Sequence, residues 1–320
     1  MRAPDFWRGR GVLSTLLLPA AIGYEAASRL RRAAGRPWRG PVPVVCVGNL
    51  VAGGAGKTPT AIAIAHRLDR TGRSAHILTR GYGGRMHGPV RVETGLSSFR
   101  DVGDEALLLA ARAPTWVSRD RPAGARAAAA AGAQIIVMDD GFQNPTLAKD
   151  LSLIVIDGGY GLGNGRVMPA GPLRESLDSG LARADAVVLI GEDETGLVAE
   201  IAARRPVLRA RLAPTEAAKA LAGKPVLAFA GIGRPEKFFR TLAELGCQIV
   251  DAVPYPDHHV YRPDEIMRLV EMANEAGAEP VTTEKDFARL PPEARLMVRA
   301  VPVELAWQDE AAIDRLLARL

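Results

Sequence analysis

A glycine-rich stretch that ends in Lys57 and Thr58 carries the clearest chemical signal in the sequence. It joins an apolar run at 42–48 to an amphipathic helical pattern at 57–70. Small residues let backbone N–H groups approach phosphate oxygens, and a helix amino terminus favours anions. The lysine would neutralise β- and γ-phosphates, and the threonine hydroxyl would ligate Mg²⁺. We therefore predict a nucleoside triphosphate site formed by Val51, Ala52, Gly53, Gly54, Ala55, Gly56, Lys57 and Thr58.

Val51 departs from the usual spacing of such a loop. The pattern G-x-x-x-x-G-K-[ST] places glycine where this chain has valine. The substitution changes the entrance of the loop but leaves the backbone donors of 53–58 in place. We interpret the stretch as a phosphate-binding loop in spite of Val51.

Two adjacent carboxylates, Asp139 and Asp140, follow the apolar run QIIVM (134–138). Ligands of α/β sheets lie at the carboxyl ends of strands, so these acids are expected where Mg²⁺ would be held, directly or through water. Asp-Asp-Gly is also good turn chemistry, and a purely structural turn is the alternative. The loop and the acids together predict a nucleotide site, without distinguishing a kinase from an ATPase or a switch.

Further polar clusters stand where structure alone requires nothing polar. Asp104 and Glu105 open a helical pattern, and Arg121 stands at another helix start, an unusual place for a cation. An ordinary acidic first turn and a solvated arginine are the structural alternatives. His258 and His259 are adjacent, but no further ligands stand at zinc spacing. The pair is therefore not predicted to be a metal site.

The composition indicates a globular protein with an uneven charge distribution. The 320 residues are 48% hydrophobic and 24% charged, with a net charge of +5. Residues 1–40 carry eight arginines against Asp5 and Glu25, so the remainder is close to neutral. Few aromatic residues are present for base stacking, and we expect no nucleic-acid partner. Cys46 and Cys247 are predicted to be buried, reduced thiols, which suits the cytosol.

The apolar stretch 12–28 lies among these arginines. It is shorter than the ~20 residues that span a bilayer, and Pro19 interrupts it. A cleaved signal peptide and a plain core helix are the alternatives. We favour an interfacial or shallowly inserted anchor, with Phe6, Trp7 and Tyr24 at headgroup depth.

The elements that must position these residues alternate between strands and helices. Apolar runs without strict alternation predict strands covered on both faces, hence a mainly parallel sheet. The predicted fold is α/β: a P-loop NTPase-like sheet with helices on both faces and a second, smaller α/β domain. Predicted strands are 42–48, 75–80, 115–118, 134–139, 151–157, 186–190 and 206–212, and predicted helices are 57–70, 104–113, 121–131, 235–245 and 263–276.

Four parts of the chain follow from this pattern. Residues 1–35 are the basic, membrane-associating segment, and 36–220 form the P-loop core. Residues 221–302 form the smaller domain, expected to close over the nucleotide. The last part, 303–320, is a strand and a helix that either domain could incorporate.

Eight short motifs, in order along the chain, resemble those of the tetraacyldisaccharide 4'-kinase (lipid A 4'-kinase) family. One such motif would be a weak signal, whereas eight in order are specific. They are VGNLxxGGxGKT (47–58), TRGYG (79–83), GDE (103–105), DDGFQ (139–143), PxGPLRE (169–175), DHH (257–259) and TTEKD (282–286), together with the arginine-flanked apolar amino terminus.

The resemblance implies a magnesium-dependent lipid kinase. It would transfer the γ-phosphate of ATP to the 4'-hydroxyl of a tetraacylated glucosamine disaccharide 1-phosphate, in lipid A biosynthesis. Asp104 is implied as the base for that hydroxyl, coupled to His258, with Lys57 on the phosphates. Asp104 and His258 would meet only on domain closure, which excludes water.

Supporting roles follow from the same resemblance. Glu105 would orient Lys57 or the Asp104–His258 pair. Arg121 and Glu175 would contact phosphate and metal indirectly, and Gln143 is a further supporting residue. No role is implied for TTEKD. The lipid substrate and the basic anchor place the protein at the cytoplasmic face of a bacterial inner membrane, peripheral or shallowly inserted.

Two positions differ from the family pattern. Asn144 stands where the family commonly has histidine, so an acid or base role there is in doubt. Ala106 replaces a common proline and should not affect the chemistry.

The rival interpretation is a switch ATPase of the partitioning or metallochaperone type, which also uses G-G-x-G-K-T. Such proteins carry a signature lysine directly before the two glycines, where this chain has Ala52. A structural membrane adaptor with a vestigial loop is less compatible with Lys57, Thr58 and the paired acids. The kinase interpretation is preferred.

Overall fold

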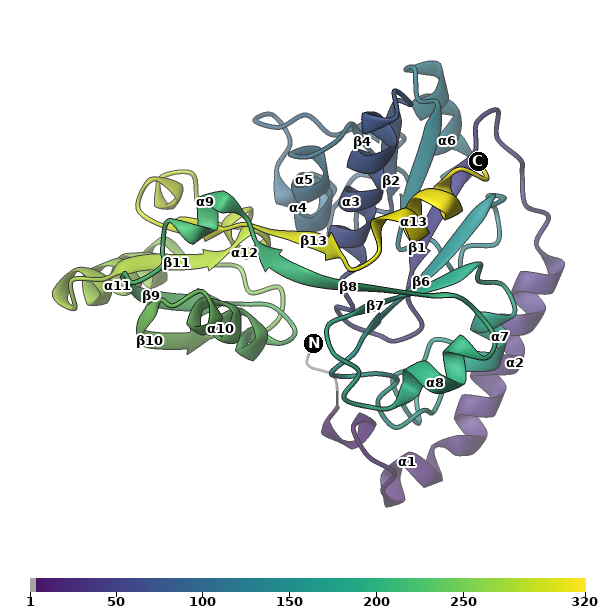
Figure 1. Cartoon of the computed structure of the whole chain (residues 1–320), viewed down its shortest axis with the longest axis horizontal. Helices are drawn as coiled ribbons and strands as arrows, with labels where there is room; N and C mark the ends of the chain where they lie inside the picture. Colours follow the sequence, from purple (N-terminus) through teal and green to yellow (C-terminus); the bar gives the residue numbers. More distant parts are fainter. Residues whose placement is uncertain (1–3) are drawn as a thin grey trace. The chain divides into compact units, whose positions relative to one another are not determined.

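The computed structural model describes residues 4–320 and divides them into two compact units, whose elements are labelled in Figure 1. The smaller unit is Ala213–Glu304, and the larger unit comprises residues 4–212 together with Leu305–Leu320. The sequence placed the start of the smaller domain at 221 and its end at 302. The amino-terminal segment, treated above as a separate part, belongs to the larger unit.

The larger unit contains a nine-stranded sheet with helices between its strands. Its elements are η1 (Asp5–Trp7), α1 (Val12–Leu16), α2 (Leu18–Ala34), β1 (Val44–Gly48), α3 (Lys57–Arg70), β2 (Ala75–Thr79), β3 (Val90–Arg91), α4 (Phe99–Val102), α5 (Asp104–Ala110), β4 (Thr115–Val117), α6 (Arg121–Ala130), β5 (Ile135–Asp139), β6 (Leu151–Asp157), α7 (Leu177–Leu181), β7 (Ala186–Ile190), α8 (Leu197–Ala202), β8 (Val207–Pro214), β13 (Val303–Trp307) and α13 (Glu310–Leu317). All seven strands predicted for this part are confirmed, as are the helices α3, α5 and α6.

The sheet has the order β13-β8-β7-β6-β1-β5-β2-β4-β3. The pairs from β8 to β4 are parallel, and β3 is antiparallel to β4. Successive side chains of a strand point to opposite faces, so Val44 and Cys46 enter one core cluster while Val45 and Val47 enter the other. Side chains of α2, α6, α7 and α8 belong to the first cluster, and those of α3, α5 and α13 to the second. The predicted parallel sheet with helices on both faces is confirmed.

The smaller unit is a four-stranded parallel sheet of order β10-β9-β11-β12. Its elements are α9 (Glu216–Lys219), β9 (Pro225–Ala230), α10 (Pro235–Glu244), β10 (Gln248–Pro254), α11 (Pro263–Glu275), β11 (Glu279–Thr283), α12 (Glu284–Phe287), η2 (Ala294–Leu296) and β12 (Arg299–Val301). Phe238 and Leu242 of α10 join one core cluster, and Ile266 and Leu269 of α11 join another. The predicted α/β character of this part is confirmed.

The carboxyl-terminal strand β13 joins the larger sheet beside β8. The helix α13 that follows packs on α3, where Arg67 donates to Asp314 and Glu310. The sequence left open which domain this segment joins. Non-local pairing with β8 decides it.

The amino-terminal segment forms two helices with an inverted burial pattern. The buried residues of α1 and α2 are the small side chains Ser14, Ala21 and Ser28. Most of the large apolar residues on the same helices are exposed, namely Val12, Leu13, Leu16, Ile22 and Leu30, while Leu18 packs partly against the core. Arg32 contacts Ser179 and Glu175, so α2 lies beside α7 (Figure 1). Among residues 4–320, no helix is both long enough and apolar enough to cross a membrane.

Candidate active site

The phosphate loop connects β1 to α3, as the sequence predicts. Gly56 precedes the helix in the left-handed conformation, with φ 88°, and a Cβ there would lie 2.4 Å from Cδ1 of Ile190. Only glycine fits this position. At Gly53 and Gly54 an added Cβ would meet no atom of the described chain within 4 Å, so this side of the loop is open. The loop has the room that phosphate oxygens need.

Contacts with the segment 172–174 explain why valine is accommodated at position 51. The Ala52 amide donates to the carbonyl of Pro172 at 2.8 Å, and the Arg174 amide donates to the carbonyl of Leu50 at 2.7 Å. Val51 bridges Leu173 in antiparallel fashion and is buried in the core. The PxGPLRE motif therefore holds the entrance of the phosphate loop, and the Val51 side chain packs inside the protein.

Asp139 ends β5 in register with Val47 of β1, directly beside the phosphate loop. Its side chain is buried, and neither carboxylate oxygen has a hydrogen-bond partner among residues 4–320. Burial, followed by the negative charges of Glu105 and Asp140, raises the pKa of Asp139 to about 7. A buried carboxylate without hydrogen bonds is expensive, which makes this position a candidate ligand site.

Asp140 differs from its neighbour. Its backbone has φ 50°, a conformation that few residues other than glycine adopt, and it directs the carboxylate toward cations. Oδ1 lies 2.9 Å from Nη1 of Arg174 and 3.7 Å from Nζ of Lys57. Burial acts to raise the pKa of Asp140, but Lys57 and Arg174 outweigh it and the pKa is lowered. Asp140 is therefore an ionised partner of the loop lysine.

The residues present fit a Mg²⁺ ion. The orphaned oxygens of Asp139 are hard ligands of the kind that Mg²⁺ prefers, and Thr58 and Asp140 belong to the same edge of the sheet. In the described chain no group of three or more His, Cys, Asp and Glu side chains could hold a metal by itself. Mg²⁺ is commonly held by one or two carboxylates together with phosphates and water, so this finding is compatible with a nucleotide-dependent site.

Asp104 and Glu105 begin α5, which follows a tightly packed glycine. Gly103 has φ 90°, and a Cβ there would lie 2.4 Å from the carbonyl oxygen of Tyr82. This contact brings the TRGYG motif against GDE. Asp104 is buried and accepts from the amide of Glu105 at 2.9 Å. Because Glu105 acts on the pKa of Asp139, the acids of GDE and DDGFQ share one electrostatic environment.

Arg121 lies behind Asp139. It is buried at the start of α6 and donates to the carbonyls of Ser118, at 3.2 Å, and Asp139, at 3.5 Å. Burial lowers the pKa of Arg121 to about 10, against the opposing effect of Asp139 and Asp140. Its charge thus offsets part of the negative potential at the two acids from the interior of the protein.

Glu175 and Gln143 are anchors of the site. Gln143 Nε2 donates to the carbonyl of Asn49, at 2.9 Å, and to Oε1 of Glu175, at 3.1 Å. Glu175 is fully buried and also pairs with Arg183 and, at 3.5 Å, with Arg32 of α2. Every contact of Glu175 described here is internal, so it supports the phosphate loop through Gln143.

His258 lies in the smaller unit and has φ 60°. Its Nε2 is 3.5 Å from Nζ of Lys285 and 3.9 Å from Oδ1 of Asp257. The adjacent His259 is occupied structurally: it stacks on Tyr255 and lies 3.1 Å from Glu265. The two histidines therefore differ in their contacts: His259 is held by an aromatic ring and a carboxylate, and His258 lies near Lys285 and Asp257. Asp104 and His258 belong to different units.

Sequence reasoning missed several residues of these clusters. Arg174 pairs with Asp140, Asn49 carries a buried Oδ1 without a hydrogen-bond partner in the described chain, and Arg80 acts on the pKa of Arg121. All three stand inside or beside the quoted motifs. For Asn49 and Arg80 the available signal was their position directly after a strand end, and for Arg174 it was only its place in the PxGPLRE motif.

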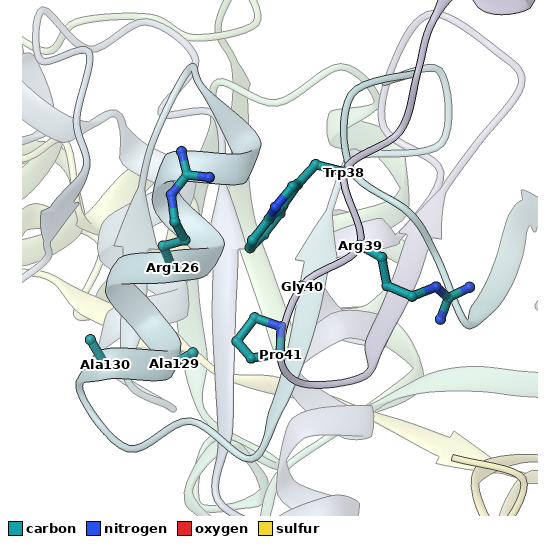
Figure 2. Close-up of a pocket in the computed structure, with 7 residues that line it drawn as sticks. All are labelled: Trp38, Arg39, Gly40, Pro41, Arg126, Ala129 and Ala130. Atoms are coloured by element: carbon teal, nitrogen blue, oxygen red, sulfur yellow. The ribbon is translucent and has the colours of Figure 1, made fainter.

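An open cavity of about 640 Å³ lies elsewhere (Figure 2). It is lined by the segment before β1 and by the carboxyl-terminal half of α6, at the edge of the sheet opposite the phosphate loop. The guanidinium carbon of Arg126 lies 4.9 Å from the centroid of the Trp38 ring, while Arg39 points away. This cavity contains none of the predicted site residues.

Comparisons with known proteins agree with this geometry. A sequence model of the family described as tetraacyldisaccharide-1-P 4'-kinase matches residues 13–320. The chain belongs to this 4'-kinase family. A tetraacyldisaccharide 4'-kinase of Rhodospirillum centenum is 57% identical over all of this chain and 97% of that protein. One of Gluconacetobacter diazotrophicus is also 57% identical, over 99% of this chain and 97% of that protein.

A solved structure of the 4'-kinase family supports the same conclusion. The crystal structure of the Aquifex aeolicus LpxK, described as in complex with ATP, is similar with a TM-score of 0.76 and 28% identity. The match covers 96% of this chain and 99% of that one. The predicted P-loop fold and kinase function are confirmed, and the switch ATPase is not favoured.

Asn144, the departure from the family pattern, has a structural role in this 4'-kinase. Its Oδ1 accepts from the amides of Thr146 and Leu147 and from the Thr146 hydroxyl. These bonds close the turn after DDGFQ. The side chain acts as a turn cap.

Proposed function

We propose that this 4'-kinase uses the edge of its larger sheet to transfer the γ-phosphate of ATP to the 4'-hydroxyl of a tetraacylated glucosamine disaccharide 1-phosphate. Asp139 carries the proposal, because its buried oxygens have no hydrogen-bond partner in the described chain and it lies beside an open phosphate loop. The ATP complex of the Aquifex aeolicus relative supports ATP as the phosphate donor.

The loop would bind the nucleotide through residues 51–58. Backbone amides of Gly53 to Thr58 would donate to phosphate oxygens, and the start of α3 adds favourable partial charge. Lys57, held near Asp140, would neutralise the β- and γ-phosphates. Val51 and Ala52 would shape the entrance of the loop, since Val51 is buried and the Ala52 amide is already bonded to the Pro172 carbonyl.

Thr58, Asp139 and Asp140 would hold Mg²⁺, directly or through water. When bound, the ion would supply positive charge that neutralises the phosphates. The protein supplies the carboxylates and keeps the charge balanced: Arg121 from behind and Arg174 beside Asp140. Through Gln143, Glu175 would keep the loop entrance in place.

In the transfer step, the 4'-oxygen attacks the γ-phosphorus. The bond between the γ-phosphorus and the β,γ-bridging oxygen breaks, and ADP is released. The hydroxyl proton must leave as the new bond forms. Asp104 would accept it, coupled to His258, which we propose meets Asp104 when the two units close over the substrates. Glu105 would orient Lys57 or this pair.

A membrane surface is the proposed location of the substrate. The exposed apolar residues Val12, Leu13, Leu16, Ile22 and Leu30 stand among arginines that would attract anionic headgroups. We propose peripheral or shallow insertion at the cytoplasmic face of a bacterial inner membrane. The inverted burial pattern of α1 and α2 supports this location.

A lipid kinase assay tests the function. Purified protein with ATP, Mg²⁺ and detergent-dispersed disaccharide 1-phosphate should yield a lipid heavier by one phosphate in mass spectrometry. ATP hydrolysis without lipid phosphorylation would favour the switch instead. Asp104→Asn should lower kcat about 10²–10⁴-fold while ATP affinity stays nearly unchanged. Asp101→Asn is the matched control, because Asp101 is bonded to Arg85 and Ser98 outside the proposed site.

Vesicle flotation tests the membrane surface. Leu16→Glu with Ile22→Glu should reduce binding to phosphatidylglycerol vesicles, because both side chains are exposed and neither removes core contacts. Leu296→Glu, at a still more exposed leucine of the smaller unit, is the control. Equal binding of both variants would refute the proposed location.

A further inference from the structure

We propose that Asp286 and Arg289 are positioning residues for His258, and that this is the role of the TTEKD segment (282–286), which contains Asp286 and ends three residues before Arg289. The buried pair fixes the Gly231 peptide, and that peptide holds the backbone of His258. The inference rests on the proposed function, in which His258 acts with Asp104. It concerns residues of the smaller unit alone.

Asp286 is the centre of the arrangement. Its side chain is fully buried, and Oδ1 accepts from three donors: the Gly231 amide at 3.0 Å, the Tyr261 hydroxyl at 2.9 Å and Nη2 of Arg289 at 2.9 Å. Oδ2 accepts from the Thr283 hydroxyl at 2.6 Å. Burial, and then the Asp286 charge, raises the pKa of Tyr261, so its hydroxyl remains a donor.

Arg289 holds the other side of the same peptide. Nη2 donates to the Gly231 carbonyl at 3.0 Å, and Nη1 donates to the His259 carbonyl at 3.2 Å. The Gly231 carbonyl also accepts from the His258 amide at 3.0 Å. The Asp286–Arg289 ion pair therefore bonds both the amide and the carbonyl of Gly231. Through these bonds it is linked to both histidines of the 257–259 loop.

His258 needs such a grip because its backbone is in the left-handed region, with φ 60°. A residue other than glycine adopts this conformation at a cost in free energy and keeps it only where the surroundings impose it. Gly231 permits the close approach: a Cβ there would lie 3.0 Å from Oδ1 of Asp286 and from the Tyr261 hydroxyl. Gly231, held by Asp286 and Arg289, therefore provides the surroundings that impose the conformation of His258.

The same segment also reaches the imidazole. Lys285, next to Asp286 in the short helix α12, places Nζ 3.5 Å from Nε2 of His258. An ammonium only donates, so Nε2 is the acceptor in this contact. TTEKD therefore acts on His258 in two ways: Asp286 holds Gly231, which accepts from the His258 amide, and Lys285 contacts the ring directly.

A purely stabilising role would not require this chemistry. A buried ion pair is often no more stabilising than apolar residues of similar volume, because desolvating both charges offsets their attraction. Its advantage is geometric, since a guanidinium fork can bond two carbonyls and a carboxylate at fixed angles. Misplacing a reacting group by about 1 Å can cost on the order of 10²-fold in rate.

Arg289→Lys tests the inference, because lysine keeps the charge and loses the fork. We expect kcat to fall about 100-fold with KM for ATP nearly unchanged. In a His258→Ala background the same substitution should have no further effect on kcat, since the group it positions is gone. Arg67→Lys is the matched control: Arg67 is a buried arginine that pairs with Asp314 and Glu310 in the larger unit, and its change should leave kcat unaltered.

A second measurement separates this inference from the proposed function. Ring signals of ¹³C-labelled histidine should shift for His258 in Arg289→Lys and in Asp286→Asn, and should remain in place for His66, His76 and His87. If His258→Ala leaves kcat intact, the proposed role of His258 fails, while the ring shift still tests the positioning. An unmoved His258 signal, or an equal loss of kcat with and without His258, would overturn the inference.

Discussion

Asp139 and Asp286 are both carboxylates with almost no exposed surface, one in each unit, and their surroundings are opposite. Asp139 has no hydrogen-bond partner for either oxygen among the described residues. Asp286 accepts from an amide, two hydroxyls and a guanidinium. A folded chain rarely leaves a buried carboxylate without partners, so the first is suited to a ligand from outside and the second to organising its own unit.

The cations nearby follow the same division. Lys57 and Arg174 lie against Asp140, one residue beyond Asp139, and Arg121 donates to the carbonyl of Asp139 and not to its carboxylate. In the smaller unit, Arg289 pairs directly with the Asp286 carboxylate. In the larger unit, the Asp139 carboxylate therefore has no cation bonded to it at the strand end. In the smaller unit, the Asp286 carboxylate is paired with Arg289.

The largest expected effect comes from removing the unpartnered carboxylate. Asp139→Ala should lower kcat about 10³-fold or more, because several kcal/mol of charge stabilisation in the transition state would be lost. Steady-state kinetics at saturating Mg²⁺ and ATP measure it. A loss below tenfold would mean that Asp139 is not needed at the reacting phosphates, and the contrast with Asp286 would lose its functional meaning.

The next effect is on stability. Asp286→Ala should destabilise the smaller unit by about 3–5 kcal/mol, because it leaves Arg289 buried without its partner. Hydrogen exchange of amides in β9 and β11 measures this locally, which avoids treating a two-unit chain as two-state. Asp139→Ala serves as the comparison and should not weaken protection in β5. Similar losses of hydrogen-exchange protection in Asp286→Ala and Asp139→Ala would show that the two carboxylates do not differ in their structural role.

A pH-dependent difference sharpens the comparison further. The pKa of Asp139 is raised to about 7 in the folded protein, above the ~3.9 of an unfolded aspartate. The folded state therefore binds more protons between those values, and this group costs stability as pH rises through that window. In EDTA, the melting temperatures of Asp139→Asn and wild type should be equal near pH 4. The melting temperature of the variant should then exceed that of wild type by an amount that grows up to about pH 7. A pH-independent difference would show that charge burial is not the cause.

The smallest effect is expected at Asn144. Its carboxamide oxygen closes a turn, so Asn144→Ala should cost about 1 kcal/mol and leave kcat within twofold. Thermal melting and the lipid kinase assay check the two parts. A large loss of kcat would indicate that this position keeps the chemistry that the family's histidine suggests.

Much of the larger unit could be predicted because its signals are local. Strands buried on both faces appear as continuous apolar runs, and the phosphate loop is one contiguous segment between a strand and a helix. Parallel strands bring their carboxyl ends to one edge, which was enough to group Asp139 and Asp140 with the loop. The short elements β3, α4, α7, α8 and β12 carry too few residues for a periodic signal.

The sequence by itself determined the fold class, the nucleotide loop and the family, since each depends on periodicity or on the order of motifs. Only the tertiary structure decided that Val51 packs against Leu173, that Glu175 serves as an internal anchor, and that Asp286 grips the loop of His258. These contacts join residues tens to more than a hundred positions apart. Their partners are set by how strands and loops pack in three dimensions, and no local pattern along the chain encodes that pairing.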